Sequence, residues 1–255
     1  MINPLGGILV DQAFQNTNLP VSATLASSLI SDTGIKNWFQ ADESYVSLSG
    51  DEIISFNDRK GSEDKLSRAS ELNSATLVDG LFGAYAGARF NASESDRMLF
   101  AGNAQDLTRP FTWSGVATLR TLSGTSNLCG TFSSSAVRAI LNVSPTTNAG
   151  KLQFLYGAAT CVGQKLVLDQ PFAFAAGYDG TNIFLRVNGV MASVAAAGSP
   201  SSSAFALGAL PGGSQFWDGD VSDLFLCNVA LNTSAGSVLL TKLNTFYKSV
   251  YGLSL

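Results

Sequence analysis

Few residues of this chain have the types and the spacing that chemistry requires. The tightest acidic group is Asp218, Asp220 and Asp223. A calcium ion takes six to eight oxygen ligands, several of them from carboxylates. Asp220 and Asp223 flank an apolar strand, so we interpret the group as part of a turn and of the exposed face of that strand. We therefore predict no metal and no cofactor. Calcium binding stays an open alternative that no sequence feature favours.

The residue types that most often perform catalysis are scarce. Histidine is absent, which excludes imidazole as a general base or as a zinc ligand. The three cysteines, Cys129, Cys161 and Cys227, are far apart in the chain and form no C-x-x-C pair. We interpret them as small buried hydrophobic residues, and we predict no catalytic residue.

Exposed aromatic rings are the remaining candidates for ligand contact. Binding sites combine such rings with a few polar groups, and sugar rings stack on them. Tyr45 and Tyr85 lie in polar segments, and we predict that they contact a glycan. Trp113 lies in an alternating segment that is typical of a strand, so we place it in the core.

The composition excludes several classes of protein. Charged residues make up 13% of the 255 residues, against about 25% in a typical soluble domain. Lysine and arginine total 15 and aspartate and glutamate 19, which leaves no cationic surplus for nucleic acid. The 45% of hydrophobic residues excludes disorder, yet no apolar run is long enough for a membrane helix. The first ten residues lack the basic start of a signal peptide, so we expect no secretion.

The start of the chain differs from the rest. Residues 1–30 hold one charged residue, and Pro4 and Pro20 interrupt any helix. We expect an extended N-terminal arm there, which binds partner proteins by strand addition. The residues of the arm that we predict to bind partners are Leu5, Ile8, Leu9, Val10 and Phe14.

Residues 31–255 are predicted to form one all-β domain. Short apolar segments recur about every ten residues, which is the spacing expected of a β-sandwich. Asn188-Gly189 predicts a two-residue hairpin turn, because both positions tolerate a positive φ. The clearest strand segments are 111–122, 128–132, 137–143, 151–156, 165–168, 172–178, 183–187, 205–207 and 221–229.

The end of the domain has helical periodicity. The spacing predicts an amphipathic helix over 234–250, capped by Thr233 or Ser234 and ended by Gly252. Its apolar face would consist of Val238, Leu239, Leu243, Phe246, Tyr247 and Val250.

Four segments match a family pattern in order. Residues 176–190 (AGYDGTNIFLRVNGV) are similar to a Y-D-G-T-x-x-x-L-Y-V-N-G hairpin. Residues 38–42 (WFQAD) and 54–61 (ISFNDRKG) are similar to W-L-D-A-D and W-x-D-x-S-G segments. Residues 88–91 (ARFN) are similar to L-R-F-N-G, and 216–231 to a closing F-x-G-x-I-x-E-V segment. Together they resemble the concanavalin A-like lectin/glucanase (laminin G-like, pentraxin-like) jelly rolls, including those of phage structural proteins.

This resemblance implies an antiparallel β-sandwich jelly roll with a C-terminal amphipathic helix. Hydrolases of the family carry E-x-D-x-x-E on one strand, with the acids on one face at the spacing of retaining chemistry. The nearest segment here is Glu94-Ser-Asp96-Arg-Met-Leu99, in which leucine takes the third acidic position. The segment also reads as a turn, so we expect that the chain is not an enzyme.

We expect a structural protein of a virus particle, a tailed-phage head decoration protein, head fibre or tail-associated adhesin. It would be made in the host cytoplasm and reside in the virion, attached by its arm and displaying a lectin-like domain. Its partners would be capsid or tail proteins and a host-surface glycan, with no nucleic acid and no membrane. Phage jelly rolls often form trimers, so a homo-oligomer is expected. The alternative is a free carbohydrate-binding module that recognises a surface glycan.

Overall fold

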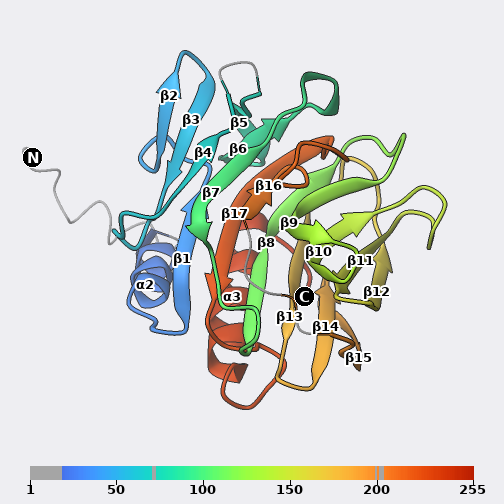
Figure 1. Cartoon of the computed structure of the whole chain (residues 1–255). Coiled ribbons are helices and arrows are strands. Elements are labelled where there is room, and N and C mark those ends of the chain that lie inside the picture. Colours follow the sequence, from blue (N-terminus) through green and yellow to red (C-terminus); the bar gives the residue numbers. More distant parts are fainter. Residues whose placement is uncertain (1–18, 71–72, 199, 201–203) are drawn as a thin grey trace, which may run out of the picture.

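The computed structural model describes residues 19–70, 73–198, 200 and 204–255 (Figure 1). These residues form a predominantly β structure, and none of their helices is long and apolar enough to cross a membrane. The helices are α2 (Leu19–Ile30), the short 3-10 helix η1 (Ala92–Glu94) and α3 (Ser237–Tyr251). The strands are β1 (Ile35–Gln40), β2 (Val46–Ser49), β3 (Glu52–Asn57), β4 (Lys65–Arg68), β5 (Thr76–Phe82), β6 (Tyr85–Phe90), β7 (Met98–Asn103), β8 (Phe111–Leu119), β9 (Ser126–Ser134), β10 (Val137–Val143), β11 (Lys151–Tyr156), β12 (Ala159–Lys165), β13 (Phe172–Tyr178), β14 (Asn182–Val187), β15 (Val190–Ala195), β16 (Ala204–Leu207) and β17 (Gly219–Cys227).

These strands belong to one continuous antiparallel sheet. One run pairs β1, β17, β8, β13, β14 and β15 in that order. Another runs from β2 through β3, β4, β7, β16, β9, β10 and β11 to β12. The β5–β6 hairpin joins the two runs, because β6 pairs with β17 and β5 with β3. The predicted antiparallel β class is confirmed, whereas the ladders close a barrel-like sheet rather than the two separate sheets that we expected.

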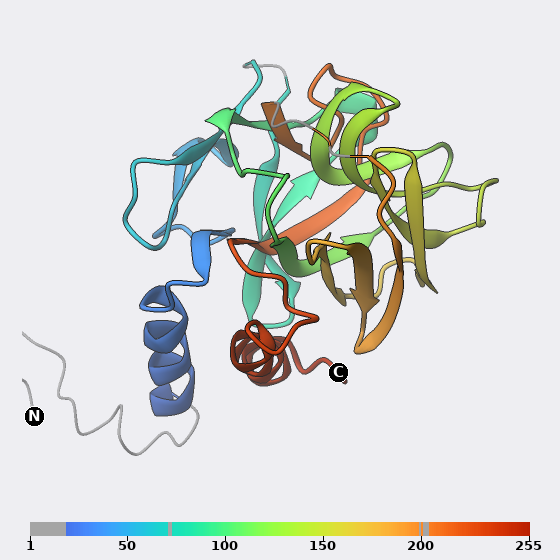
Figure 2. The same cartoon turned by 60° about the horizontal axis from the view of Figure 1, so that its bottom comes forward.

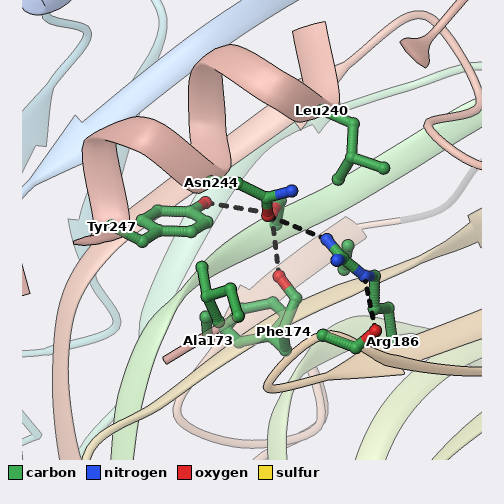
Figure 3. Close-up of a pocket in the computed structure, with 10 residues that line it drawn as sticks. Ala173, Phe174, Arg186, Leu240, Asn244 and Tyr247 are labelled. Carbon is green, nitrogen blue, oxygen red and sulfur yellow. Dashed lines mark hydrogen bonds between the residues drawn. The ribbon is translucent and has the colours of Figure 1, made fainter. Parts of the chain in front are cut away.

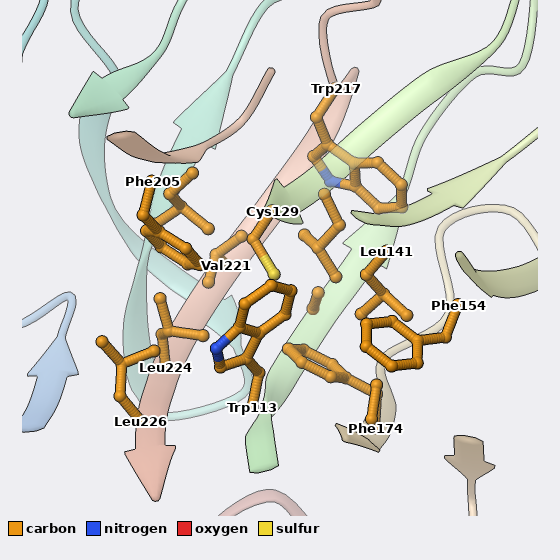
Figure 4. Packing of buried hydrophobic residues seen from close by; sticks show 14 of the residues in the cluster. Trp113, Cys129, Leu141, Phe154, Phe174, Phe205, Trp217, Val221, Leu224 and Leu226 are labelled. Carbon is orange, nitrogen blue, oxygen red and sulfur yellow. The ribbon is translucent and has the colours of Figure 1, made fainter. Parts of the chain in front are cut away.

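The main core lies inside the curved sheet. Figure 4 shows the ring of Trp113 among Cys129, Phe174 and Leu224. Together with Trp113, these residues come from four different strands. Trp113 is fully buried, as predicted. The three cysteines are buried and unpaired, also as predicted. Burial raises the pKa of the Cys129 thiol, which keeps it protonated and chemically inert.

A second core lies between the outer face of the sheet and helix α3. Every residue of β8 and β17 is buried, because alternate side chains face the inner core and the helix. Helix α3 covers this face in Figure 2, and its Phe246 ring lies 6.1 Å from the ring of Phe225 on β17. The predicted helix and its end at Gly252, in the left-handed conformation, are confirmed.

The start of α3 differs from the prediction. The helix begins at Ser237 after Gly236, without a side-chain cap. Thr233 instead donates its hydroxyl to the carbonyl of Ala230 at 2.7 Å, which holds a turn before the helix. Val238, which we placed on the apolar face, is 66% exposed.

Residues 19–30 form helix α2 instead of the extended segment that we expected through residue 30. Pro20 falls in the first turn, where its missing N–H costs no helical hydrogen bond. Ala26 and Leu29 share a core cluster with Leu239 and Leu243 of α3. Helix α2 is therefore part of the folded domain, and residues 1–18 lie outside the described residues.

Several local predictions are confirmed. Strands β10, β11 and β13 have the predicted bounds. Asn188 and Gly189 have φ values of 45° and 85° and join β14 to β15, as the hairpin turn requires.

Candidate functional site

Strand β17 changes its partner along its length. Its residues 219–221 pair with β6, and from Asp223 onward it pairs with β1. The register with β8 shifts between Val221 and Asp223, which makes Ser222 a β-bulge. The pairing with β1 ends at Gln40 and Asp223, and the pairing with β6 ends at Ala88 and Val221, so Ser222 lies at a gap between the two pairings.

A cleft of about 380 Å³ occupies this gap. Tyr85 lines the cleft and is the aromatic residue of its lining, with 37% of its surface exposed. The polar residues that line the cleft are Gln40, Asp42, Glu43, Ser44, Asp79 and Ser222. The cleft thus combines an accessible ring with hydroxyl, amide and carboxyl groups, which is the composition of a polar ligand site.

The β1–β2 loop forms one wall of the cleft and is held by its own hydrogen bonds. The carboxylate of Asp42 accepts the N–H of Ser44 at 2.9 Å. The carbonyl of Asp42 accepts the N–H of Tyr45 at 2.8 Å, and the N–H of Ala41 donates to the carbonyl of Ser222 at 2.8 Å. Much of the loop backbone is therefore already satisfied, whereas the Glu43 carboxylate and Asp42 Oδ2 accept no hydrogen bond from another described residue.

The end of helix α3 supports the cleft from below. The Tyr251 hydroxyl lies 2.8 Å from Ser222 Oγ, and Ser222 Oγ also donates to the carbonyl of Ala86 at 3.2 Å. The rings of Tyr251 and Tyr85 meet edge to face, with centroids 5.6 Å apart. These contacts position Tyr85 from the folded core.

Asp223 lies beneath the cleft and is fully buried. Its carboxylate accepts Trp38 Nε1–H at 2.7 Å and the hydroxyl proton of Tyr251. The guanidinium of Arg59 lies 4.0 Å from the centroid of the Trp38 ring. Burial raises the pKa of Asp223 to about 6, and the bonds from Tyr251 and Trp38 and the charge of Arg59 oppose this rise.

We expect the buried carboxyl of Asp223 to make stability depend on pH. Its pKa is about 6 in the folded state and near the ordinary 3.8 in the unfolded state. Between these two pKa values the folded state binds more protons than the unfolded state. The stability that the protonated Asp223 contributes is therefore fully present below the lower pKa and is lost as the pH rises through the higher one. The unfolding free energy of the wild type, relative to Asp223→Asn, should fall by about 3 kcal/mol from acidic to neutral pH.

Urea titrations of both proteins across this pH range measure the difference. Asp96, whose pKa burial also raises to about 6, is present in both proteins, so its effect cancels. A difference that stays constant with pH would contradict the assignment to Asp223.

The acidic group Asp218, Asp220 and Asp223 does not converge on one point. Asp218 pairs with Arg120 at 2.7 Å and Asp220 with Arg89 at 2.9 Å. Within the described part of the chain, no group of three or more metal-binding side chains occurs. Asp220 and Asp223 are buried rather than on an exposed strand face, because the flanking strands and α3 cover both faces of β17.

The structure separates the predicted glycan contacts. Tyr85 lines the cleft, whereas Tyr45 follows the loop residue Ser44 and its half-buried ring lies 4.7 Å from the Arg59 guanidinium. The predicted arm residues fall outside the described residues: Leu5, Ile8, Leu9, Val10 and Phe14.

Most of the cleft residues were not predicted as site residues. Asp42 stands in the family-like segment WFQAD, which we used only for the fold. Asp79 and Ser222 carry no local signal, because strand pairing alone brings them to β1. Glu94 and Asp96, the acids nearest to a hydrolase pattern, lie at η1 and outside the cleft lining.

A second cavity lies between α3 and the sheet. Figure 3 shows Tyr247 and Asn244 of the helix facing Phe174 and Arg186. Arg186 donates to Asn244 Oδ1 at 2.8 Å, and Tyr247 lies 2.9 Å from Ser114 Oγ. Its volume is about 10 Å³, the space of one water molecule. This cavity belongs to helix packing and has no room for an organic ligand.

Comparisons with known proteins identify the fold. No family model matches the chain, and no curated protein sequence matches it. A Trypanosoma rangeli sialidase in complex with the inhibitor DANA has a TM-score of 0.60 at 16% identity, over 95% of this chain and 39% of that chain. The ligand-binding domain of botulinum neurotoxin serotype D, in complex with N-acetylneuraminic acid, has a TM-score of 0.60 at 8% identity, over 91% of this chain and 56% of that chain.

A third neighbour is botulinum neurotoxin type C, whose entry into cells depends on interaction with two ganglioside molecules. Its TM-score is 0.57 at 9% identity, over 88% of this chain and 52% of that chain. The chain therefore spans between two fifths and just over half of these neighbours. At such identities the likeness shows a shared β-rich fold and nothing about activity.

One expectation is overturned by the sialidase neighbours. We expected that the chain is not an enzyme, because Leu99 takes the third acidic position and histidine is absent. Its fold recurs within the chain of an enzyme, which contradicts this expectation. Proteins that share a fold can use different residues for chemistry. The lack of the hydrolase motif of one family therefore does not exclude catalysis.

Proposed function

We propose that this chain is a lectin-like glycan-binding domain, with its binding site in the cleft beside Tyr85. The observation that carries the proposal is the meeting of an exposed ring with carboxyl, amide and hydroxyl groups in one cleft. A sugar offers an apolar C–H face to a tyrosine ring, and its hydroxyls donate to carboxylates such as Asp42 and Asp79.

The solved neighbours support this proposal. The serotype D toxin domain was solved with N-acetylneuraminic acid, and the type C toxin interacts with gangliosides. The sialidase was solved with an inhibitor and with sialic acid. Proteins of this fold thus bind carbohydrate in more than one setting.

Substitution of Tyr85 tests the proposed site. We expect Tyr85→Ala to weaken binding to a glycan, first identified on a glycan array, by at least about tenfold, or about 1.4 kcal/mol. The reason is that the substitution removes the ring on which the sugar would stack. Isothermal titration calorimetry of both proteins measures the change.

Phe132→Ala is the matched control, because Phe132 is 38% exposed and lies on β9 outside the cleft lining. It should bind the glycan as the wild type does. Equal binding by wild type and Tyr85→Ala would place the site elsewhere, and no binding by the wild type across the array would overturn the proposed function.

The virion context remains a separate proposal that rests on the sequence. A head decoration protein, head fibre or tail-associated adhesin would display this domain and attach through residues 1–18, while α2 belongs to the domain. We expect deletion of residues 1–18 to leave a folded domain that no longer attaches to particles. Full occupancy of particles by the truncated protein, measured by co-sedimentation, would contradict this proposal.

A further inference from the structure

Three carboxyl groups line the cleft. Asp42 and Glu43 come from the β1–β2 loop, and Asp79 comes from β5 of the neighbouring hairpin. Glu43 and Asp79 are exposed, and Asp42 is half-buried. None of the three forms an ion pair with another described residue. Their negative charges therefore face no opposite charge among the described residues of the lining.

The described lining contains no lysine or arginine, so no cation within it offsets these charges. Arg59 is the cation attached to this region, through a hydrogen bond to Gln40 Oε1. Its guanidinium lies between the rings of Trp38 and Tyr45, at 4.0 Å and 4.7 Å from their centroids. Its charge also acts on the buried carboxyl of Asp223, where it opposes the rise in pKa that burial causes.

Most N–H groups of the loop backbone are not free to hold an anion. Proteins bind carboxylates through arginine or through free backbone N–H groups. The N–H groups of Ala41, Ser44 and Tyr45 are already used, by Ser222 and by Asp42. A carboxylated sugar in this cleft would meet three like charges without compensation, and like charges at short range repel strongly where solvent is partly excluded. A neutral sugar would instead donate its hydroxyl protons to these carboxylates.

We infer that the cleft selects sugar units without negative charge and rejects sialic acid and other carboxylated sugars. The inference rests on the proposed function, since it names the class of glycan that the same cleft takes. It separates this chain by charge from proteins of the same fold that were solved with sialic acid.

Matched glycan pairs test the selection. Each pair consists of a neutral glycan and its sialylated derivative, such as lactose with 3′-sialyllactose and asialofetuin with fetuin. We expect the wild type to bind the neutral member at least about tenfold more tightly. The preference should narrow at high salt, which screens the carboxylates.

Isosteric neutralisation identifies the groups responsible. The double variant Glu43→Gln/Asp79→Asn keeps the shape of the cleft, and we expect it to reduce the preference for neutral glycans at least about fivefold. Asp169→Asn is the matched control, since it removes an exposed carboxylate outside the cleft lining at a positive φ that asparagine tolerates.

The outcomes separate the two proposals. Equal or tighter binding of the sialylated members, lost in Tyr85→Ala, would overturn the charge selection and leave the glycan-binding function standing. An unchanged preference in the double variant would also overturn the selection by these carboxylates. Absence of binding to every member of every pair would overturn both.

Discussion

Asp223→Ala is expected to lower the free energy of unfolding by about 3 kcal/mol at about pH 5, where the carboxyl with its raised pKa is mostly protonated. The substitution removes the acceptor of Trp38 Nε1–H and of the Tyr251 hydroxyl, both of which are enclosed by α3 and the sheet. A buried donor that loses its partner costs the full desolvation of that group.

Urea unfolding followed by tryptophan fluorescence measures this loss, because Trp38, Trp113 and Trp217 are all buried. Asp51→Ala is the matched control, since Asp51 is exposed and its substitution should change stability by less than about 0.5 kcal/mol. Equal effects of the two substitutions would mean that the carboxyl of Asp223 does not hold β1, β17 and α3 together.

Gly115→Ala is expected to destabilise the protein by about 3 kcal/mol, at the upper end of the cost of overpacking. A Cβ atom at Gly115 would lie 2.1 Å from the carbonyl oxygen of Asp223 and 3.0 Å from the ring of Phe174. Neither neighbour can move easily, because the first belongs to the β8–β17 ladder and the second to the core. The strands must separate at the point where β17 bulges below the cleft.

Gly124→Ala provides the matched control. A Cβ atom at Gly124 meets nothing within 4 Å, so this substitution should be neutral or slightly stabilising through the unfolded state. Differential scanning calorimetry of both variants measures the contrast. If Gly115→Ala melts within a degree or two of the wild type, then β8 and β17 do not approach each other as closely as described.

The features that were predictable from the sequence depend on neighbouring residues. Asn188-Gly189 specifies its hairpin through two positive φ values, and the spacing of Leu239, Leu243 and Phe246 specifies a helix face. Pro20 misled us because proline stops a helix in its interior but not in its first turn. The same residue type thus predicts opposite outcomes according to its place in the element.

The cleft depends on contacts that no local pattern records. Gln40, Asp79 and Ser222 are brought together by the pairing of β17 with both β1 and β6, across more than half of the chain. Asp223 was expected on an exposed face because it flanks an apolar strand, and nothing near it in sequence indicates that α3 covers it. Tyr85 could be singled out because it lies in a polar segment, although its partners could not.

Because β17 changes its partner at Ser222, the floor of the cleft is formed by buried strand residues and its rim by more exposed residues. Ser222 and Asp223 are buried in the framework, whereas residues 42–44 and 83–85 at the rim contain no buried side chain. Rim residues can therefore be exchanged without repacking the framework, as hypervariable loops are exchanged on an antibody domain. A selection experiment that keeps Gly83, whose φ of 73° favours glycine, and randomises the other five positions could retarget the same scaffold to new ligands.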